Sequence, residues 1–252
     1  MDQLTVSFEE RLEEIEDYLR LLEAIETVAQ SRVPRLESLP PESSGYVIST
    51  RQLRILYSGV FLQLYNLVEA TVVSCLNWVT EATLQQGAWM PGDLNDSLQR
   101  EWVRVMVRTH TDMTYESRLN GALSLCKHLV EALPIPGFSV DKGGGGNWDD
   151  NEIERVVKRL GFTLQVEQKI YSSIKRKVRN DFGPLGLVKD LRNKLAHGSI
   201  SFAECGDNVT VSDLRDITDK TAAYMRQVVQ QFVSFVDGHG YLIPDKRPAA
   251  AT

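Results

Sequence analysis

The chain has 252 residues, of which 42% are hydrophobic and 25% are charged. This length is enough for one large domain or two small ones, and the composition excludes a chain that is disordered for most of its length. The formal net charge is −6, but residues 1–30 alone carry nine acidic side chains and two arginines. The rest of the chain is therefore about neutral, and total charge gives no support to nucleic-acid binding.

The N-terminal sequence and the cysteines narrow the class of protein further. The first residues, MDQLTVSFEERLEE, are acidic, unlike a secretory signal, and no run of 18 or more apolar residues predicts a membrane span. Cys75, Cys126 and Cys205 are odd in number and far apart, so they indicate neither a disulfide framework nor a metal or redox pair. We therefore expect a cytoplasmic protein that does not bind membranes.

Helical periodicity dominates the chain, because apolar residues recur at spacings of three and four. The predicted helices span residues 7–30, 51–85, 94–109, 117–131, 150–160, 165–180, 185–197 and 212–237. The first is expected to begin with a capping box of Ser7 and Glu10. The second is apolar on more than one side, so we expect it to be the central helix of a bundle.

Prolines and glycines separate these helices. Residues 31–50 and a glycine-rich segment near residues 134–148 are predicted to be loops. No Lys-Ser or Lys-Thr follows Gly143 to Gly146 as a phosphate loop requires, so a flexible linker is expected there. Residues 200–211 are compatible with a two-strand hairpin.

The fold class expected from these elements is all-α: a helical bundle with long helices and at most one small β-hairpin. We expect a single domain over residues 1–243 and a disordered tail over residues 244–252. The four histidines do not pair with one another or with cysteines at the spacing of metal ligands. Neither a metal ion nor another cofactor is therefore expected.

Two groups of basic residues are candidates for binding an RNA backbone. Residues 169–179 contain several basic side chains and no acid, and the predicted helix over 94–109 carries arginines four residues apart on one face. The candidate RNA-binding residues in these groups are Lys175, Arg176, Lys177, Arg179, Arg104 and Arg108, and Lys189 and Lys194 of the predicted helix over 185–197 are added to them. The alternative for each group is a solvated helix face.

The most specific pattern is RNKLAHG at residues 192–198. With four histidines and 18 arginines, about 0.3 Arg-x4-His pairs are expected by chance, and about 0.01 if Asn must follow the Arg. Asn193 and His197 share a helix face, and the helix dipole favours a protonated His197 in the last turn. Histidine transfers protons near neutral pH, and Arg192 can bind a phosphate through two donors. The pattern thus indicates RNA cleavage without a metal; the alternative is an Arg and a His that only cap the helix or bind an acid.

This motif resembles the Arg-x4–6-His signature of HEPN domains in its RNxxxH form. Together with LYNLVE at residues 64–69 and the long helix after the motif, it makes the chain similar to the MAE_28990/MAE_18760-like HEPN group over roughly residues 7–240. The resemblance implies a helical homodimer in which two motifs form one composite cleft. It also implies a metal-independent endoribonuclease that leaves a 2′,3′-cyclic phosphate and acts as a toxin or an antiviral-defence effector.

The resemblance also implies roles for individual residues. Arg192 would bind the scissile phosphate, His197 would act as acid or base on the 2′-hydroxyl, and Asn193 would orient His197 or the phosphate. Glu69 would support the site, with Tyr65 and Asn66 beside it. The implied partners are an RNA substrate, a second copy, and an antitoxin or neighbouring defence protein. The alternatives are a non-catalytic HEPN module that binds RNA or protein, and a dimeric scaffold.

Overall fold

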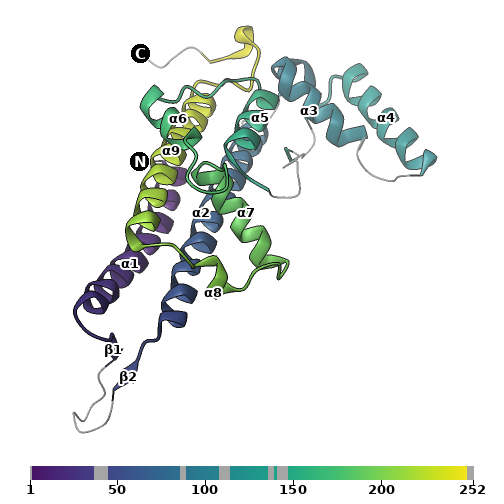
Figure 1. The fold of residues 1–252 in the computed structure, drawn as a ribbon. Helices are drawn as coiled ribbons and strands as arrows, with labels where there is room; N and C mark the ends of the chain where they lie inside the picture. The colour runs from purple at the N-terminus through teal and green to yellow at the C-terminus, as the bar shows by residue number, and fades with distance from the viewer. Residues whose placement is uncertain are drawn as a thin grey trace. The chain divides into compact units, whose positions relative to one another are not determined.

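A computed structural model describes residues 2–36, 45–85, 89–107, 114–135, 139–140 and 147–248. These residues form nine α-helices and one pair of two-residue strands, so the all-α prediction is confirmed. The helices are α1 (Gln3–Ser31), α2 (Thr50–Gln85), α3 (Asp96–Val107), α4 (Tyr115–Val130), α5 (Asp150–Leu160), α6 (Gln168–Lys175), α7 (Pro184–Ala196), α8 (Phe202–Cys205) and α9 (Val211–Asp237) (Figure 1).

The small sheet lies in a segment that the sequence predicts to be a loop. β1 (Arg35–Leu36) and β2 (Tyr46–Val47) pair in an antiparallel register. The hairpin predicted over residues 200–211 is wrong, because α8 begins there instead. The backbone N–H of Glu204 donates to Ser201 Oγ (3.2 Å), and the N–H of Ser201 donates to Glu204 Oε2 (2.7 Å). This capping box satisfies two amides locally and favours a helical turn over strand pairing.

The start of α1 also differs from the prediction. The helix begins four residues earlier than expected, and the carboxylate of Asp2 accepts hydrogen bonds from both the backbone N–H and the hydroxyl of Thr5 (2.7 Å each). Ser7 and Glu10 therefore lie inside the helix and do not cap it. An aspartate before the first turn is a better cap here because its carboxylate accepts two hydrogen bonds at once.

The chain divides into two compact units, which are described separately. Unit 1 comprises Met1–Thr5, Ala70–Val166 and Gln227–Thr252, and unit 2 comprises Val6–Glu69 and Glu167–Arg226. The prediction of one domain over residues 1–243 stays a prediction. The 3-10 turn at Pro244–Lys246 falls within the segment predicted to be a tail, of which residues 249–252 lie outside the described residues.

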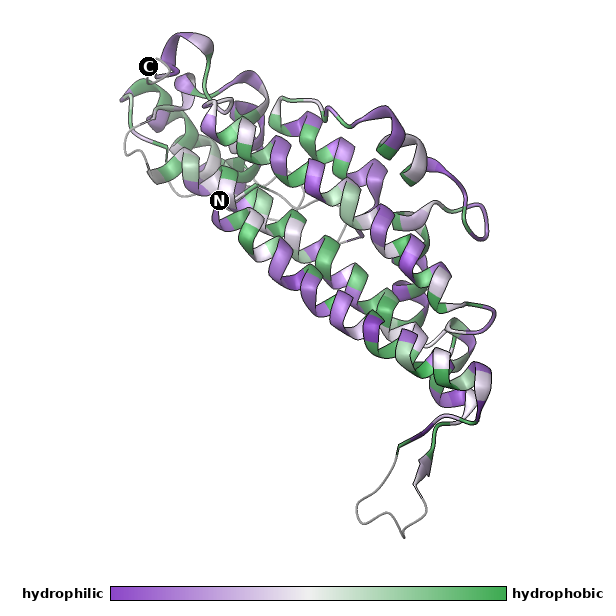
Figure 2. Ribbon diagram, turned by 90° about the vertical axis from the view of Figure 1, so that its left-hand side faces the viewer, coloured by the Kyte–Doolittle hydropathy of each residue, from purple (hydrophilic) through white to green (hydrophobic). Residues whose placement is uncertain are grey.

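Unit 2 is built on α1, the first part of α2 and the first part of α9. Apolar side chains from all three helices are buried in it, including Leu19, Leu64 and Leu214. Figure 2 shows the banding of hydrophobic and hydrophilic residues along the long helices that such amphipathic packing requires. The hydroxyl of Tyr18 on α1 donates to the carbonyl of Leu56 on α2 (2.9 Å) and links these two helices.

The acidic helix α1 is partly neutralised inside unit 2. Arg226 on α9 binds the carboxylate of Glu9 through two nitrogens (2.7 and 2.9 Å), and Arg215 binds both Glu16 and Glu23 (2.8 Å to Glu23). The three acids recur every seven residues, so they lie along one side of the helix. Two arginines of α9 therefore face three of the nine acids in this segment.

Unit 1 contains α3, α4 and α5 with the remaining parts of α2 and α9. Asn95 joins three of its segments. Its Oδ1 accepts from the backbone N–H of Leu98 at the start of α3 (2.8 Å), and its Nδ2 donates to the carbonyls of Leu160 (3.1 Å) and Gly240 (2.8 Å). The side chain is thus a helix cap and a clamp on two other chain segments at the same time.

In the described part of the chain, one helix, Thr50–Leu84, passes a length and hydropathy test for a membrane span, with a mean hydropathy of 1.4. Of the window that passes, 56% is buried in the protein. A buried core helix passes the same test, so the finding is weak evidence for a span. It agrees with the prediction that this helix is central, and the expected absence of membrane binding stays a prediction.

Replacing Asn95 by alanine is expected to lower the free energy of unfolding by about 2–3 kcal/mol, because one helix cap and two further hydrogen bonds are lost. Urea unfolding followed by circular dichroism measures the change. Asn120→Ala on the exposed surface of α4 is the control, with an expected change within about 0.5 kcal/mol. Equal stabilities of the two variants would contradict the role of Asn95.

Candidate functional site

The C-terminus of α7 fixes the position of His197. His197 is the C-cap residue, and Gly198 has a left-handed φ of +67°. The backbone N–H of Ser199 donates to the carbonyl of Lys194 (2.8 Å), and that of Gly198 donates to Leu195 (3.1 Å). These two bonds form a Schellman motif, which glycine favours because it has no Cβ to clash at this φ. The imidazole is therefore exposed at the negative end of the helix dipole.

Arg192 is held by three side chains of unit 2. Its guanidinium carbon lies 4.2 Å from the ring centroid of Tyr65. One terminal nitrogen donates to Asn193 Oδ1 (2.9 Å), and the other lies 3.5 Å from Glu69 Oε2. Tyr65 and Glu69 are one turn apart on α2, so they present one face toward Arg192. The structure thus brings together four of the six residues that the sequence assigns to the centre of the site.

The contact between Arg192 and Glu69 is weak. A charge-assisted N–H···O bond is ordinarily 2.7–2.9 Å long, and this one is 3.5 Å. The two side chains are 31% and 37% exposed, so water screens the attraction between them. The guanidinium is consequently oriented by Tyr65 and Asn193 and keeps the capacity to bind another anion.

His197 lies one turn after Asn193 on the same face of α7. Its backbone N–H donates to the Asn193 carbonyl (3.0 Å). In the part of the chain that the structure describes, the His197 side chain has no hydrogen bond or ion pair. The predicted chemistry needs a proton acceptor and a phosphate ligand. The exposed imidazole of His197 and the guanidinium of Arg192 are groups of these two kinds, and they follow one another along α7.

Asn66 lies on a different side of α2 from its neighbour Tyr65. Its Oδ1 accepts a long hydrogen bond from Arg11 on α1 (3.4 Å). Adjacent residues on a helix point about 100° apart, so LYNLVE cannot present all its polar side chains to one partner. The structure does not bring Asn66 to Arg192.

Most of the basic candidates belong to unit 2. Lys175 at the end of α6 lies over the ring of Tyr171 (5.2 Å to the centroid). Lys177 pairs with Asp181 (2.8 Å) on an exposed loop, and Arg176 before it is also exposed. Sequence reasoning did not select Tyr171, although its spacing of four from Lys175 within a helix is the signal for such a pair.

On α7, Lys194 pairs with Asp190 (2.8 Å), and Lys189 is half-buried. Arg179 is only partly exposed and acts on Cys205 of α8. Burial raises the pKa of the Cys205 thiol to about 11, and the nearby charge of Arg179 works in the opposite direction. Arg179 is therefore turned toward the protein to a greater extent than Arg176 and Lys177.

Arg104 belongs to unit 1 and forms an ion pair with a buried carboxylate. Glu101 is 2% exposed and accepts from Arg104 (2.7 Å) and from Arg159 (2.6 and 3.1 Å). A buried carboxylate needs such cationic partners, so this pairing accounts for Arg104 without an RNA ligand. Arg108 lies outside the described residues.

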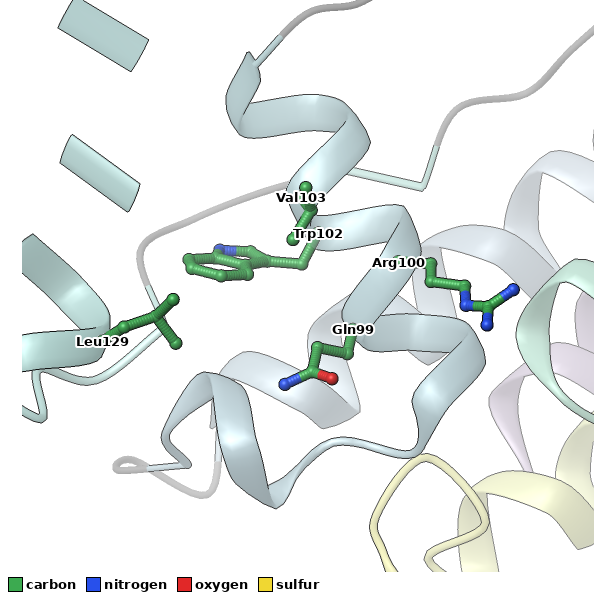
Figure 3. A pocket seen from close by; sticks show the side chains of 5 residues that line it. All are labelled: Gln99, Arg100, Trp102, Val103 and Leu129. Carbon is green, nitrogen blue, oxygen red and sulfur yellow. The ribbon is translucent and has the colours of Figure 1, made fainter. Parts of the chain in front are cut away.

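A cavity of about 380 Å³ lies in unit 1 between α3 and α4 (Figure 3). Its lining comprises Gln99, Arg100, Trp102, Val103 and Leu129. In Figure 3 the indole of Trp102 extends toward Leu129, and the guanidinium of Arg100 points away from both. None of the residues predicted for the functional site lines this cavity.

Gly198→Ala is expected to lower the free energy of unfolding by about 1 kcal/mol. A Cβ at this position would meet no atom within 4 Å, so the loss is backbone strain at φ +67° alone. Gly198→Asn is the matched control, because Asn tolerates the left-handed region better than Ala does. Urea unfolding of the three proteins measures the difference, and an Ala variant as stable as the native chain would contradict a left-handed C-cap.

The chain matches a known protein family. A family model described as "HEPN_MAE_28990:/-like HEPN" matches residues 1–241, which include the α2 segment with Tyr65 and Glu69 and the whole of α7. Searches of the curated proteins and of the solved structures give no match. HEPN domains are commonly found in nucleases that act on RNA. By this match over nearly its whole length, the chain belongs to the MAE_28990-like HEPN family.

Proposed function

We propose that the chain is a metal-independent endoribonuclease whose site is formed by the motifs of two copies at a homodimer interface. The observation that carries the proposal is the arrangement of Arg192. Its guanidinium is oriented by Tyr65 and Asn193 and is only weakly bound by a carboxylate, and the whole side chain is 31% exposed. The exposed His197 follows on the same helix. Membership of the HEPN family supports the same activity.

The proposed reaction is a transesterification within RNA. Arg192 binds a non-bridging oxygen of the scissile phosphate and takes up the negative charge that develops there. His197 accepts the proton of the adjacent 2′-hydroxyl, whose oxygen attacks phosphorus. The bond from phosphorus to the 5′-oxygen breaks. The products are a 2′,3′-cyclic phosphate and a free 5′-hydroxyl, and the balance of atoms requires neither a metal ion nor a redox cofactor.

The two proton transfers of this reaction support a homodimer. One proton leaves the 2′-hydroxyl and one must reach the departing 5′-oxygen, whereas the sequence places a single histidine, His197, in unit 2. In a composite cleft, His197 of the partner subunit supplies the second group. Asn193 acts as a positioning residue, since it accepts a hydrogen bond from Arg192.

The biological setting is part of the same proposal. We propose a cytoplasmic toxin or antiviral-defence effector that binds RNA, a second copy of itself, and an antitoxin or neighbouring defence protein. The support is the family of the chain. Growth arrest on expression, relieved by a protein encoded beside it, is the result that this setting requires.

One observation favours a second candidate function, a non-catalytic HEPN module that binds RNA or protein. The contacts of Arg192 with Tyr65 and Glu69 are also those of an arginine that joins two helices. This function requires that the native protein binds RNA without cutting it and that binding survives the loss of His197.

His197→Ala is expected to lower the cleavage rate at least about 100-fold, because general acid–base catalysis contributes that much or more. The assay uses total RNA in EDTA, with the 3′ ends of the products mapped. Circular dichroism and light scattering confirm that the variant folds and dimerises. Arg192→Lys keeps the charge but loses the two-donor fork, and a loss of at least about tenfold is expected. Full activity of His197→Ala would overturn the proposal.

A mixed dimer tests whether both imidazoles are needed. Native chains and His197→Ala chains with different tags are co-expressed, and the heterodimer is isolated through both tags. If two motifs form one cleft, the heterodimer has the low rate of the homodimeric His197→Ala variant. Half the native rate would instead show two independent sites and would contradict a composite cleft. A heterodimer of two native chains is the control.

A further inference from the structure

The loop before α7 ends in a tight turn that fixes the backbone of Phe182. Asn180 and Asp181 both have left-handed φ values, +50° and +64°. The N–H of Phe182 donates to the carbonyl of Arg179 (2.9 Å), and the N–H of Val178 donates to the carbonyl of Phe182 (2.7 Å). Two consecutive left-handed residues closed by these bonds are typical of a type I′ turn, the form with the twist of a hairpin.

The ring of Phe182 lies against the first turns of α7. A Cβ built at Gly186 would be 3.3 Å from Phe182 Cδ1 and 3.8 Å from Cγ, so the absence of a side chain at Gly186 lets the ring approach the helix. The ring is nevertheless 37% exposed. Phe182 is thus held by its backbone and on one side, while part of the ring is open to solvent.

Gly186 lies on the same face of α7 as the catalytic candidates. Asn193 and His197 follow it by seven and eleven residues, which is close to two and three whole turns. The helix rises 1.5 Å per residue, so Phe182 and His197 lie at the two ends of a face about 16 Å long. Just before the turn, Arg176 is an exposed cation, and Lys177 is an exposed cation that pairs with Asp181 of the turn (2.8 Å).

We propose that Phe182 is a base-stacking subsite of the ribonuclease, which binds a nucleotide away from the scissile phosphate. This inference rests on the proposed function of His197. An exposed aromatic ring next to cations is the combination with which proteins bind single-stranded nucleic acid, because bases stack on the ring and the cations bind phosphates. Bases in a duplex are already stacked on one another, so the subsite selects unpaired RNA.

The length of the α7 face predicts which substrates use the subsite. A dinucleotide has one phosphodiester and cannot reach both His197 and a ring about 16 Å farther along the helix. An unstructured octanucleotide can. The ring therefore contributes to the binding of long substrates and leaves the chemistry at the scissile bond unchanged.

The experiment compares cleavage of an adenylyl dinucleotide and of an unstructured octanucleotide by three proteins. Phe182→Leu keeps an apolar side chain on Gly186 but has no ring, and Phe182→Trp keeps a ring. For the octanucleotide, Phe182→Leu is expected to lower kcat/KM at least about fivefold through KM, and Phe182→Trp to retain it. The dinucleotide is expected to be cut equally by all three. Equal octanucleotide kinetics for Phe182→Leu and the native protein would overturn the subsite.

A second measurement separates the subsite from the proposed activity. Fluorescence anisotropy measures the Kd of a 2′-O-methyl octanucleotide, which has no attacking hydroxyl. A Kd at least about fivefold higher for Phe182→Leu supports the subsite even if the native protein cuts neither substrate, in which case only the proposed function fails. An unchanged Kd overturns the subsite and leaves the proposed function standing. Light scattering is the control. A Phe182→Leu protein that no longer dimerises would show that the ring belongs to the subunit interface, and this result would also overturn the subsite.

Discussion

The contact of Arg192 with the ring of Tyr65 joins α7 to α2, and the candidate site depends on it. Tyr65 is 3% exposed, so the ring is a fixed surface from which water is largely removed, and a guanidinium over such a ring is bound more strongly than one over an exposed ring. Glu69 contributes less, because its contact is long and screened. Stacking orients the plane of the guanidinium and leaves its N–H groups for Asn193 and for an anion.

The two ends of α7 fix the positions of two further side chains, His197 and Phe182. At the C-terminus, Gly198 ends the helix at His197 through a Schellman motif. At the N-terminus, a turn of two left-handed residues places Phe182 on Gly186. Both ends are set by local hydrogen bonds, whereas the middle of the helix is fixed by side chains of α2. The turn before α7 and the helix itself therefore present an aromatic ring, a guanidinium and an imidazole in a defined order along the chain.

Charge is distributed differently from what total composition indicates. The acidic segment at the N-terminus is partly neutralised by Arg215 and Arg226, which are distant in sequence but face it from α9. Arg104 is bound to a buried glutamate in unit 1. On the exposed loop before α7, Lys177 pairs with Asp181, whereas the neighbouring Arg176 is an exposed cation. Total charge says little about RNA binding here, because ion pairs within the chain neutralise some basic residues and not others.

The sequence by itself determined the helices and the motif, because both depend on short-range spacing. Apolar residues three and four apart specify amphipathic helices, and RNxxxH needs only six consecutive residues. Tertiary structure alone decided that Tyr65 and Glu69 reach Arg192 while Asn66 turns to Arg11, since the packing of α2 selects one face of the helix. It also decided that Arg104 pairs with Glu101 and that the ring of Phe182 packs on Gly186.

The prediction over residues 200–211 was wrong for a local reason: a capping box there forms a helical turn in place of a hairpin. Contacts between distant segments leave no periodic signal in one sequence, so only the folded chain shows them.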